Sequence, residues 1–271
     1  MDWSTAISAW CRSLAAASRS RETIYLRRVQ LRRVAESLGR TLGPWEVGTA
    51  ELLDWLGSQR WSRDTLRSHR AALRSFYGWA VAAGHLPESP AAALPAIRPA
   101  QPRPRPAADL TYRRALDVAE PWERLALRLG AEAGLRRGEI ARVHADWLLD
   151  DLGGRTLRVL GKGDKVRYVP LSDDLAAAVE RACRDGGGYA FPGQVEGHLS
   201  PGYLGKRISA LLPPGVSTHS LRHRFATRAY NVEHDVFAVQ QLLGHASPET
   251  TRRYVWVTDD RLRSTVERAA A

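Results

Sequence analysis

The chain has 271 residues, 44% of them hydrophobic, and its 40 lysines and arginines outnumber its 29 aspartates and glutamates to give a net charge of +11. This hydrophobic content excludes a disordered chain and predicts a globular protein of two domains. The excess of basic residues indicates a polyanionic partner, nucleic acid first, although a basic protein without such a partner stays open. Cys11 and Cys183 are too few for a disulfide framework, and no signal peptide or membrane-spanning run is found, so we expect a cytoplasmic protein with no membrane partner.

Residues 1–90 show helical periodicity, and two segments within them repeat one pattern. Each segment opens with a serine that can cap a helix, Ser20 in the first and Ser62 in the second, and an arginine follows each serine. Apolar residues then recur at helical spacing and predict one buried face per helix. These residues are Ile24, Leu31, Val34 and Leu38 in the first segment, and Leu66, Leu73, Phe76 and Ala80 in the second.

A basic stripe runs beside each predicted apolar face. Its residues are spaced by three or four: Arg21, Tyr25, Arg28 and Arg32 in the first helix, and Arg63, Arg67, Arg70 and Arg74 in the second. Like charges at this spacing repel each other and weaken a helix, and DNA would compensate the repulsion. We interpret the stripes as DNA-binding surfaces; a pair of solvated helix faces is the alternative.

Repeated prolines after these helices forbid a continuous helix and favour an extended connection. They place an interdomain linker at residues 91–108, between a helical DNA-binding domain at residues 1–90 and a second domain at residues 109–271. The sequence therefore predicts two domains joined by a segment rich in proline and arginine.

The second domain is predicted to mix helices with a small sheet. Helical patterns around residues 110–144 lead to short apolar stretches at Asp146, Thr156 and Val166, which are separated by turn-forming residues. Helices return from Ser172 onward. The expected fold class is α+β, with an all-helical first domain and a mainly helical second domain that carries a small antiparallel sheet.

Four short sequences in the second half carry residue types suited to chemistry. They are AGLRRGEI from Ala133, GKGDK from Gly161, HSLRHRFAT from His219 and LLGHASPETTRRYVWV from Leu242. Taken singly, each has an ordinary structural explanation, such as a surface arginine or a packed tyrosine. His219 and His223 have the spacing of a zinc pair, but Ser220 stands where a zincin protease has glutamate, so we expect no metal.

Together these four sequences resemble the tyrosine recombinase, or phage integrase, family, which includes the phage integrases and the Xer chromosome-dimer resolvases. The resemblance spans essentially the whole chain. Carried over position by position, it implies the catalytic residues Arg136, Lys162, His219, Arg222, His245 and Tyr254, with Glu139 as a supporting acidic residue. It also implies a helical core-binding domain and a catalytic domain with a C-terminal tail helix, which together clamp duplex DNA.

The chemistry explains this set of residues. A phenol has a pKa near ~10, so Tyr254 needs nearby cations to lose its proton as it attacks phosphorus. Arg136 and Arg222 can hold the non-bridging phosphate oxygens, and Lys162 can protonate the leaving 5′ oxygen. His219 could assist proton movement at the tyrosine and His245 could donate a hydrogen bond to the phosphate, although the division of roles between them stays open. The phosphotyrosyl ester retains the bond energy, so we expect no ATP, metal or other cofactor.

The resemblance also implies the assembly and its setting. The expected partner is double-stranded DNA at a recombination site, with two protomers per site, four in the synapse and a Holliday-junction intermediate, and a directionality factor is a further candidate partner. We favour a phage or mobile-element integrase, in a bacterial cell or a phage's bacterial host, over a Xer-like resolvase. A type IB topoisomerase and a non-catalytic DNA-binding protein also stay open.

Three further expectations concern particular segments. The chain begins with the core-binding domain, so no arm-binding domain is expected before it. Leu262, Val266 and Ala269 could form the apolar stripe of the tail helix, which would dock on a neighbouring subunit or on its own domain. Arg137 and Arg224 depart from the family pattern, and we expect both to add contacts to DNA phosphates.

Overall fold

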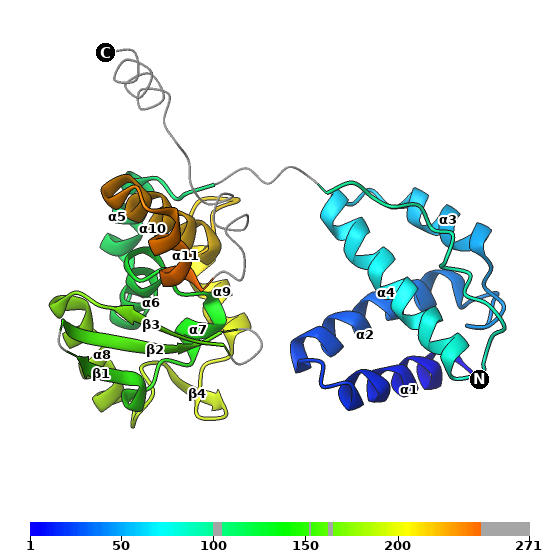
Figure 1. Cartoon of the computed structure of the whole chain (residues 1–271), viewed down its shortest axis with the longest axis horizontal. Coiled ribbons are helices and arrows are strands. Elements are labelled where there is room, and N and C mark those ends of the chain that lie inside the picture. The colour runs from blue at the N-terminus through cyan, green and yellow to red at the C-terminus, as the bar shows by residue number, and fades with distance from the viewer. Residues whose placement is uncertain (100–104, 152, 162–164, 245–271) are drawn as a thin grey trace, which may run out of the picture. The chain divides into compact units, whose positions relative to one another are not determined.

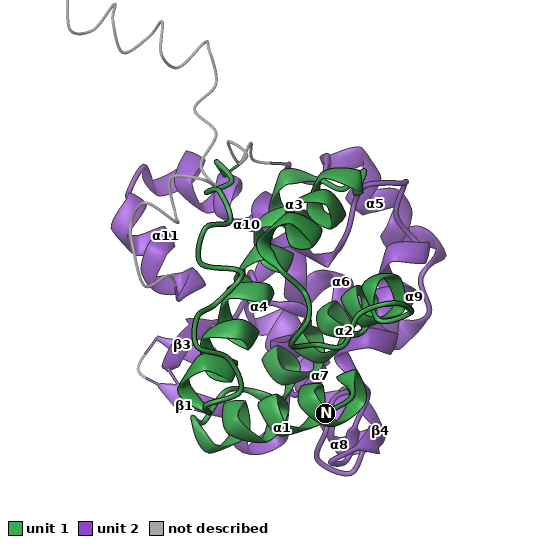
Figure 2. Ribbon diagram, turned by 90° about the vertical axis from the view of Figure 1, so that its right-hand side faces the viewer, with its two compact units in different colours: residues 1–101 green, residues 102–271 purple. Residues whose placement is uncertain are grey.

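The computed structural model describes residues 1–99, 105–151, 153–161 and 165–244. The chain divides into two compact units, residues 1–101 and residues 102–271, which Figure 2 colours separately. This division falls inside the linker range that the sequence predicts. In the described ranges, no helix combines the length and the apolar character that crossing a membrane requires.

Unit 1, residues 1–101, is helical throughout its described part. Its helices are α1 (Trp3–Ala16), α2 (Arg21–Leu38), α3 (Thr49–Ser58) and α4 (Arg63–Ala82) (Figure 1). Ser20 and Ser62 cap α2 and α4 as predicted, each hydroxyl accepting the backbone N–H of the threonine three residues on at 3.3 Å. Their hydrogen bonds explain why both helices begin where they do.

The core of unit 1 is aromatic and lies on the predicted apolar faces. Leu31, Val34, Leu73, Phe76 and Ala80 are buried, while Ile24, Leu38 and Leu66 are partly exposed. The Phe76 ring lies 5.5 Å from that of Trp10 and 5.7 Å from that of Trp45, centroid to centroid. The predicted faces of α2 and α4 are therefore confirmed as the faces that meet inside the unit.

The first residues of the predicted linker pack against α4. Ala91 and Leu94 belong to the core of unit 1. The Arg70 guanidinium donates to the Leu94 carbonyl at 2.7 and 3.2 Å, and Arg74 donates to the Ala92 carbonyl at 3.0 Å. Unit 1 thus extends beyond residue 90, because these linker residues are buried or held by side chains of α4.

Unit 2 combines helices with a small sheet in its described residues. The helices are α5 (Asp109–Val118), α6 (Pro121–Glu132), α7 (Arg137–Ala141), α8 (Asp173–Asp185), α9 (Pro201–Ala210), α10 (Thr218–Glu233) and α11 (Val236–Leu243), with the 3-10 turn η1 (Ala145–Trp147). The strands are β1 (Leu148–Asp151), β2 (Gly154–Leu160), β3 (Val166–Pro170) and the short β4 (Pro192–Val195). The sequence did not predict β4.

The predicted small sheet is present. Its order is β1-β2-β3, with both pairs antiparallel, and Leu148 pairs with Leu157 while Val159 pairs with Arg167. Leu157, Val159 and Val169 turn inward and are buried in the core of the unit. This arrangement confirms the α+β fold class.

Helices α6 and α10 pack closely at the centre of unit 2. Gly130 of α6 leaves no spare room, since a Cβ added there would lie 3.3 Å from the Cβ of Leu221 on α10. The start of the unit is also fastened to α10, because the Ala107 N–H donates to the Ser220 carbonyl at 3.0 Å and Asp109 pairs with Arg224 at 2.8 Å. Helix α10 is therefore a fixed base for the side chains that it carries.

Candidate active site

Arg136 and Glu139 are joined around the N-terminus of α7. The Glu139 carboxylate accepts the backbone N–H of Arg136 at 2.7 Å and its guanidinium at 2.8 Å. These two bonds fix the backbone and the side chain of Arg136 together. The pair confirms only that the two residues meet; their roles stay predictions.

Arg167 of β3 approaches the same carboxylate from the sheet. Its two terminal nitrogens donate to the two Glu139 oxygens at 2.9 and 2.7 Å. Burial alone would raise the pKa of Glu139, but the hydrogen bonds and charge of Arg167, together with Arg136, lower it to about 2. Glu139 is therefore an anion that holds cationic side chains at neutral pH.

Arg222 projects from α10 into the middle of this cluster and is only 1% exposed. Its terminal nitrogens donate to the carbonyls of Gly134 and Leu243, both at 2.6 Å, and one of them lies 3.8 Å from a Glu139 oxygen. A charged group is retained at such depth only when its hydrogen bonds are satisfied. Arg222 thereby ties the loop before α7 to the end of α11.

Arg136 and Arg222 border an open pocket of about 390 Å³, the cationic pocket. Its lining consists of Arg136, Arg137, Gly138, Gly205, Ser209, Ser217, Thr218, His219 and Arg222. Three guanidinium groups, an imidazole and three hydroxyl-bearing side chains surround the space, and no carboxylate of the described residues lines it. Such a lining suits a phosphate group, since guanidinium and hydroxyl groups donate hydrogen bonds to anionic oxygens.

The imidazoles on the first turns of α10 are held neutral. The pKa of His219 is lowered mainly by partial burial and further by the positive charges of Arg222 and Arg136. Burial likewise lowers the pKa of His223 to about 4, with His219 and Arg222 contributing. The two rings meet edge to face, with centroids 4.7 Å apart. At neutral pH His219 can therefore both accept and donate a hydrogen bond.

Three predicted catalytic residues, Lys162, His245 and Tyr254, lie outside the described residues, as does the predicted tail helix. Their described neighbours lie beside the cluster. Gly161 closes the β2–β3 hairpin by donating to the Lys165 carbonyl at 2.8 Å, and Gly244 follows α11. A Cβ on Gly244 would lie 2.8 Å from the Cδ of Arg167.

Sequence reasoning missed Arg167. The signal was present in β3, where exposed and buried residues alternate and Arg167 shares the inward side with Val169. Side chains two apart on a strand face the same way, and a charge on the buried face needs a partner. Alternation alone could have marked this arginine as paired, although it could not have named Glu139 as the partner.

The predicted DNA-binding residues all lie on α2 and α4. Arg21, Tyr25, Arg28, Arg32, Arg63, Arg67 and Arg74 are exposed, and Arg70 is half-buried. The two helices are bridged by a hydrogen bond of 2.7 Å from Gln30 to the Ser68 hydroxyl. Because Arg70 and Arg74 donate to backbone carbonyls of residues 92–94, their guanidinium groups are partly used within unit 1.

The structure separates the two arginines that were expected to add phosphate contacts. Arg137 is exposed, lines the pocket and lies across Gly205, where its side chain leaves no room for a Cβ. Arg224 instead is 9% exposed, pairs with Asp109 and lies 4.4 Å above the Tyr112 ring. These contacts argue against the expectation for Arg224, because its guanidinium holds the start of unit 2 against α10.

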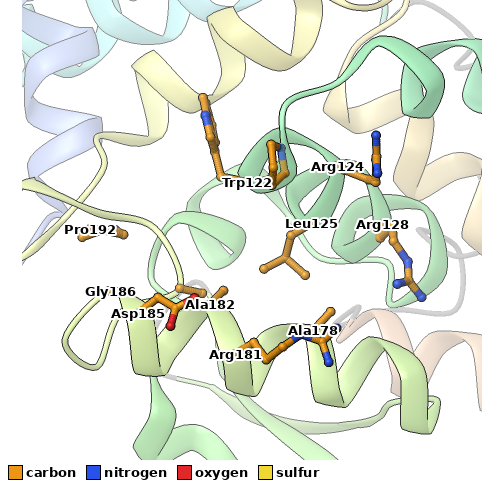
Figure 3. A pocket seen from close by; sticks show the side chains of 12 residues that line it. Trp122, Arg124, Leu125, Arg128, Ala178, Arg181, Ala182, Asp185, Gly186 and Pro192 are labelled. Carbon is orange, nitrogen blue, oxygen red and sulfur yellow. The ribbon is translucent and has the colours of Figure 1, made fainter.

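A larger hollow of about 520 Å³ lies elsewhere in unit 2, between α6 and α8 (Figure 3). Trp122 and Leu125 of α6 and Ala182 of α8 provide apolar surface. Arg128 at its edge is already paired with Asp174 at 2.8 Å. Among the described residues, none that lines this hollow also lines the cationic pocket, and no predicted catalytic residue that the structure describes lies in it.

Comparison with known proteins agrees with this fold. Residues 110–261 match the model of the phage integrase family. Tyrosine recombinase XerC of Rhodospirillum centenum is 36% identical over 262 residues, covering 87% of this chain and 76% of that protein. XerC of Xylella fastidiosa strain M23 is 33% identical over 207 residues, covering 71% and 70%.

Solved structures include similar chains. The integrase from mycobacterium phage Brujita is 27% identical, with a TM-score of 0.50 over 95% of this chain and 96% of that one. Lambda integrase in a dimer bound to a COC′ core site has a TM-score of 0.74 at 20% identity, over 95% and 99% of the two chains. The fold is thus that of an integrase-like catalytic domain joined to a helical unit. The chain belongs to the phage integrase family and is a tyrosine recombinase, an enzyme that cleaves and rejoins DNA strands.

Proposed function

We propose that the pocket bordered by α7, α9 and α10 binds the scissile phosphodiester of a DNA recombination site. The observation that carries this proposal is the meeting of Arg136, Arg222 and His219 around one pocket, which no carboxylate lines in the part of the chain that the structure describes. The Glu139 carboxylate does not line the pocket, and it accepts hydrogen bonds from both Arg136 and Arg167. Fixed donors of this kind stabilise the negative charge that develops on a phosphate during transfer.

In this proposal the hydroxyl oxygen of Tyr254 attacks phosphorus and the bond to the 5′ oxygen breaks. Lys162 gives its proton to the leaving oxygen, and a 3′-phosphotyrosyl ester forms. A 5′ hydroxyl from another strand then attacks the same phosphorus and releases the tyrosine. His219 in its neutral state would accept the proton that leaves Tyr254 and return it when the tyrosine is released, while Lys162 would regain its proton from the attacking 5′ hydroxyl. His245 would donate a hydrogen bond to the phosphate.

The direct test uses duplexes that carry a candidate core site and a nick that traps cleavage. Wild-type protein in EDTA should form a protein–DNA adduct that survives denaturing electrophoresis, and Tyr254→Phe should form none. An equal adduct with the phenylalanine variant would assign the nucleophile to another residue. No adduct at a verified binding site would leave the non-catalytic DNA-binding alternative in place.

We infer an assembly of two protomers on each site and four in the synapse, acting through a Holliday junction in a bacterial cell. One solved neighbour is a lambda integrase tetramer bound to a Holliday junction, with a TM-score of 0.74 at 20% identity. The predicted tail helix would link neighbouring subunits, and deletion of residues 258–271 should then weaken synapsis. A directionality factor stays a prediction.

Two settings have support. The phage Brujita integrase supports the integration and excision of a phage or mobile element. The relatives named XerC, at 36% and 33% identity, support a Xer-like resolvase. Deleting the gene distinguishes the two settings, because an integrase mutant would fail to excise its element while a resolvase mutant would accumulate unresolved chromosome dimers.

A further inference from the structure

Arg167 lies where three segments of unit 2 meet. From β3 it donates twice to Glu139, at 2.9 and 2.7 Å, and its Nε donates to the Leu242 carbonyl of α11 at 2.9 Å. It is 8% exposed and does not line the cationic pocket. All three nitrogens of its guanidinium therefore donate to the protein itself, and none of these bonds requires a ligand.

The residues around Arg167 are neighbours, in the sequence or through a hydrogen bond, of predicted catalytic residues. Glu139 is the residue that fixes Arg136. A Cβ on Gly161, the residue before Lys162, would lie 3.8 Å from a terminal nitrogen of Arg167. Gly244, the residue before His245, packs against the Arg167 side chain at the end of α11. One guanidinium thus adjoins Glu139, which is the partner of Arg136, and the two glycines that precede Lys162 and His245 in the sequence.

We propose that Arg167 is a positioning residue, which holds the base of the Lys162 hairpin and the end of α11 in register with the Arg136–Glu139 pair. This inference rests on the proposed function of the pocket. A planar fork can serve two carboxylate oxygens and a carbonyl at once, which a lysine ammonium cannot do with the same geometry. Displacing a catalytic group by about 1 Å can cost about 100-fold in rate.

The chain offers a matched control in Arg224. It is 9% exposed, belongs to the same unit, and also bonds one carboxylate, Asp109, and one carbonyl, that of Ala131. Neither of these partners is a predicted catalytic residue. Arg224→Met should therefore lower thermal stability, just as Arg167→Met should, while the arrangement of the catalytic residues stays unchanged.

The test measures single-turnover cleavage at saturating protein, below the melting temperature of each variant. Two nicked duplexes are compared, one with the ordinary 5′ oxygen and one with sulfur in its place. A thiol has a pKa near ~8.5, so sulfur leaves without a proton from a general acid. Lys162→Ala reports whether the lysine is that acid.

We expect Arg167→Met to cleave the oxygen substrate about 100-fold more slowly than wild type. Arg167→Lys should be slowed less, and Arg224→Met should keep a nearly wild-type rate. Sulfur should restore much of the rate in both Arg167→Met and Lys162→Ala. If sulfur restored the cleavage rate of Lys162→Ala but not that of Arg167→Met, the proposal that Arg167 positions the lysine would be overturned.

A wild-type rate in Arg167→Met, or an equal slowing in Arg224→Met, would overturn the inference whatever Lys162→Ala does. If sulfur fails to restore Lys162→Ala, the acid assigned in the proposed function is wrong. The inference is then decided by whether Arg167→Met, in contrast to Arg224→Met, is slow on both substrates.

Discussion

Glu139 organises a site in which positive charges would otherwise repel each other. Its carboxylate accepts Arg136 and Arg167 and lies 3.8 Å from Arg222. A buried carboxylate is unfavourable unless it is paired, and the pairing here is strong enough to reverse the effect of burial on its pKa. A residue that does not line the pocket thus determines the geometry of those that do.

Glu139→Gln should lower the free energy of unfolding by about 3–5 kcal/mol, because it leaves buried arginines without their anion. Chemical denaturation at neutral pH measures this difference. The folded pKa of Glu139 is depressed to about 2, so its stabilising contribution is present above about pH 4.5 and is lost as the pH falls towards 2. The gap between wild type and variant should narrow over that window, and a constant gap would contradict the ionic explanation.

Arg137 and Arg224 should differ in their effect on DNA binding. Arg137→Ala should reduce the salt dependence of affinity by about one phosphate contact, since its exposed side chain lines the cationic pocket. Arg224→Ala should leave the slope unchanged, because the Asp109 carboxylate and the Tyr112 ring occupy its guanidinium. If affinity depended on salt equally in Arg137→Ala and in wild type, Arg137 would not contact a DNA phosphate.

At the scale of elements, α2, α4 and the β1–β3 sheet could be predicted because their signals are local. A capping serine and a repeat of apolar residues specify a helix wherever it packs. The contacts of Arg70 with the Leu94 carbonyl and of Arg167 with Glu139 could not be predicted. Each joins segments whose approach depends on tertiary packing, and an arginine looks the same in sequence whether it binds phosphate or a buried partner.

Helix α4 should divide its arginines between two tasks. Arg63 and Arg67 are exposed, and their replacement by alanine should weaken DNA binding and lower its salt dependence. Replacing Arg70 and Arg74 should instead release residues 92–94, since their carbonyls lose these donors. Limited proteolysis of the free protein would show faster cutting there in the second pair of variants only; equal cutting in both pairs would argue against this division.

The start of α10 should make stability depend on pH. The folded pKa of His223 is about 4 against an ordinary 6.5, so the folded protein binds fewer protons than the unfolded chain between these values. The stabilising contribution is full above about pH 6.5 and is lost as the pH falls through about 4. The melting temperature should fall less steeply over this range in His223→Gln than in wild type, and parallel curves would assign the dependence to other groups.

At the scale of the whole molecule, the two units have separate hydrophobic cores. The core of unit 1 contains residues from Trp3 to Leu94, and that of unit 2 contains residues from Ala107 to Leu221, with a small third cluster at α10 and α11. Each unit also carries more basic than acidic residues. Each unit therefore has a hydrophobic core of its own and a net positive charge that favours contact with DNA.

If both units bind DNA as predicted, their connection makes the second contact intramolecular, which can raise affinity by about 10²–10⁴-fold without any new contact. A protease site inserted between residues 99 and 105 tests this, because cutting removes the connection and leaves both cores intact. The uncut insertion protein should bind a core site as wild type does, and the cut protein should bind more weakly by about that factor. Unchanged affinity after cutting would mean that one unit supplies nearly all of the binding energy. If the isolated unit 2 accounts for that affinity, the basic stripes of α2 and α4 are solvated helix faces.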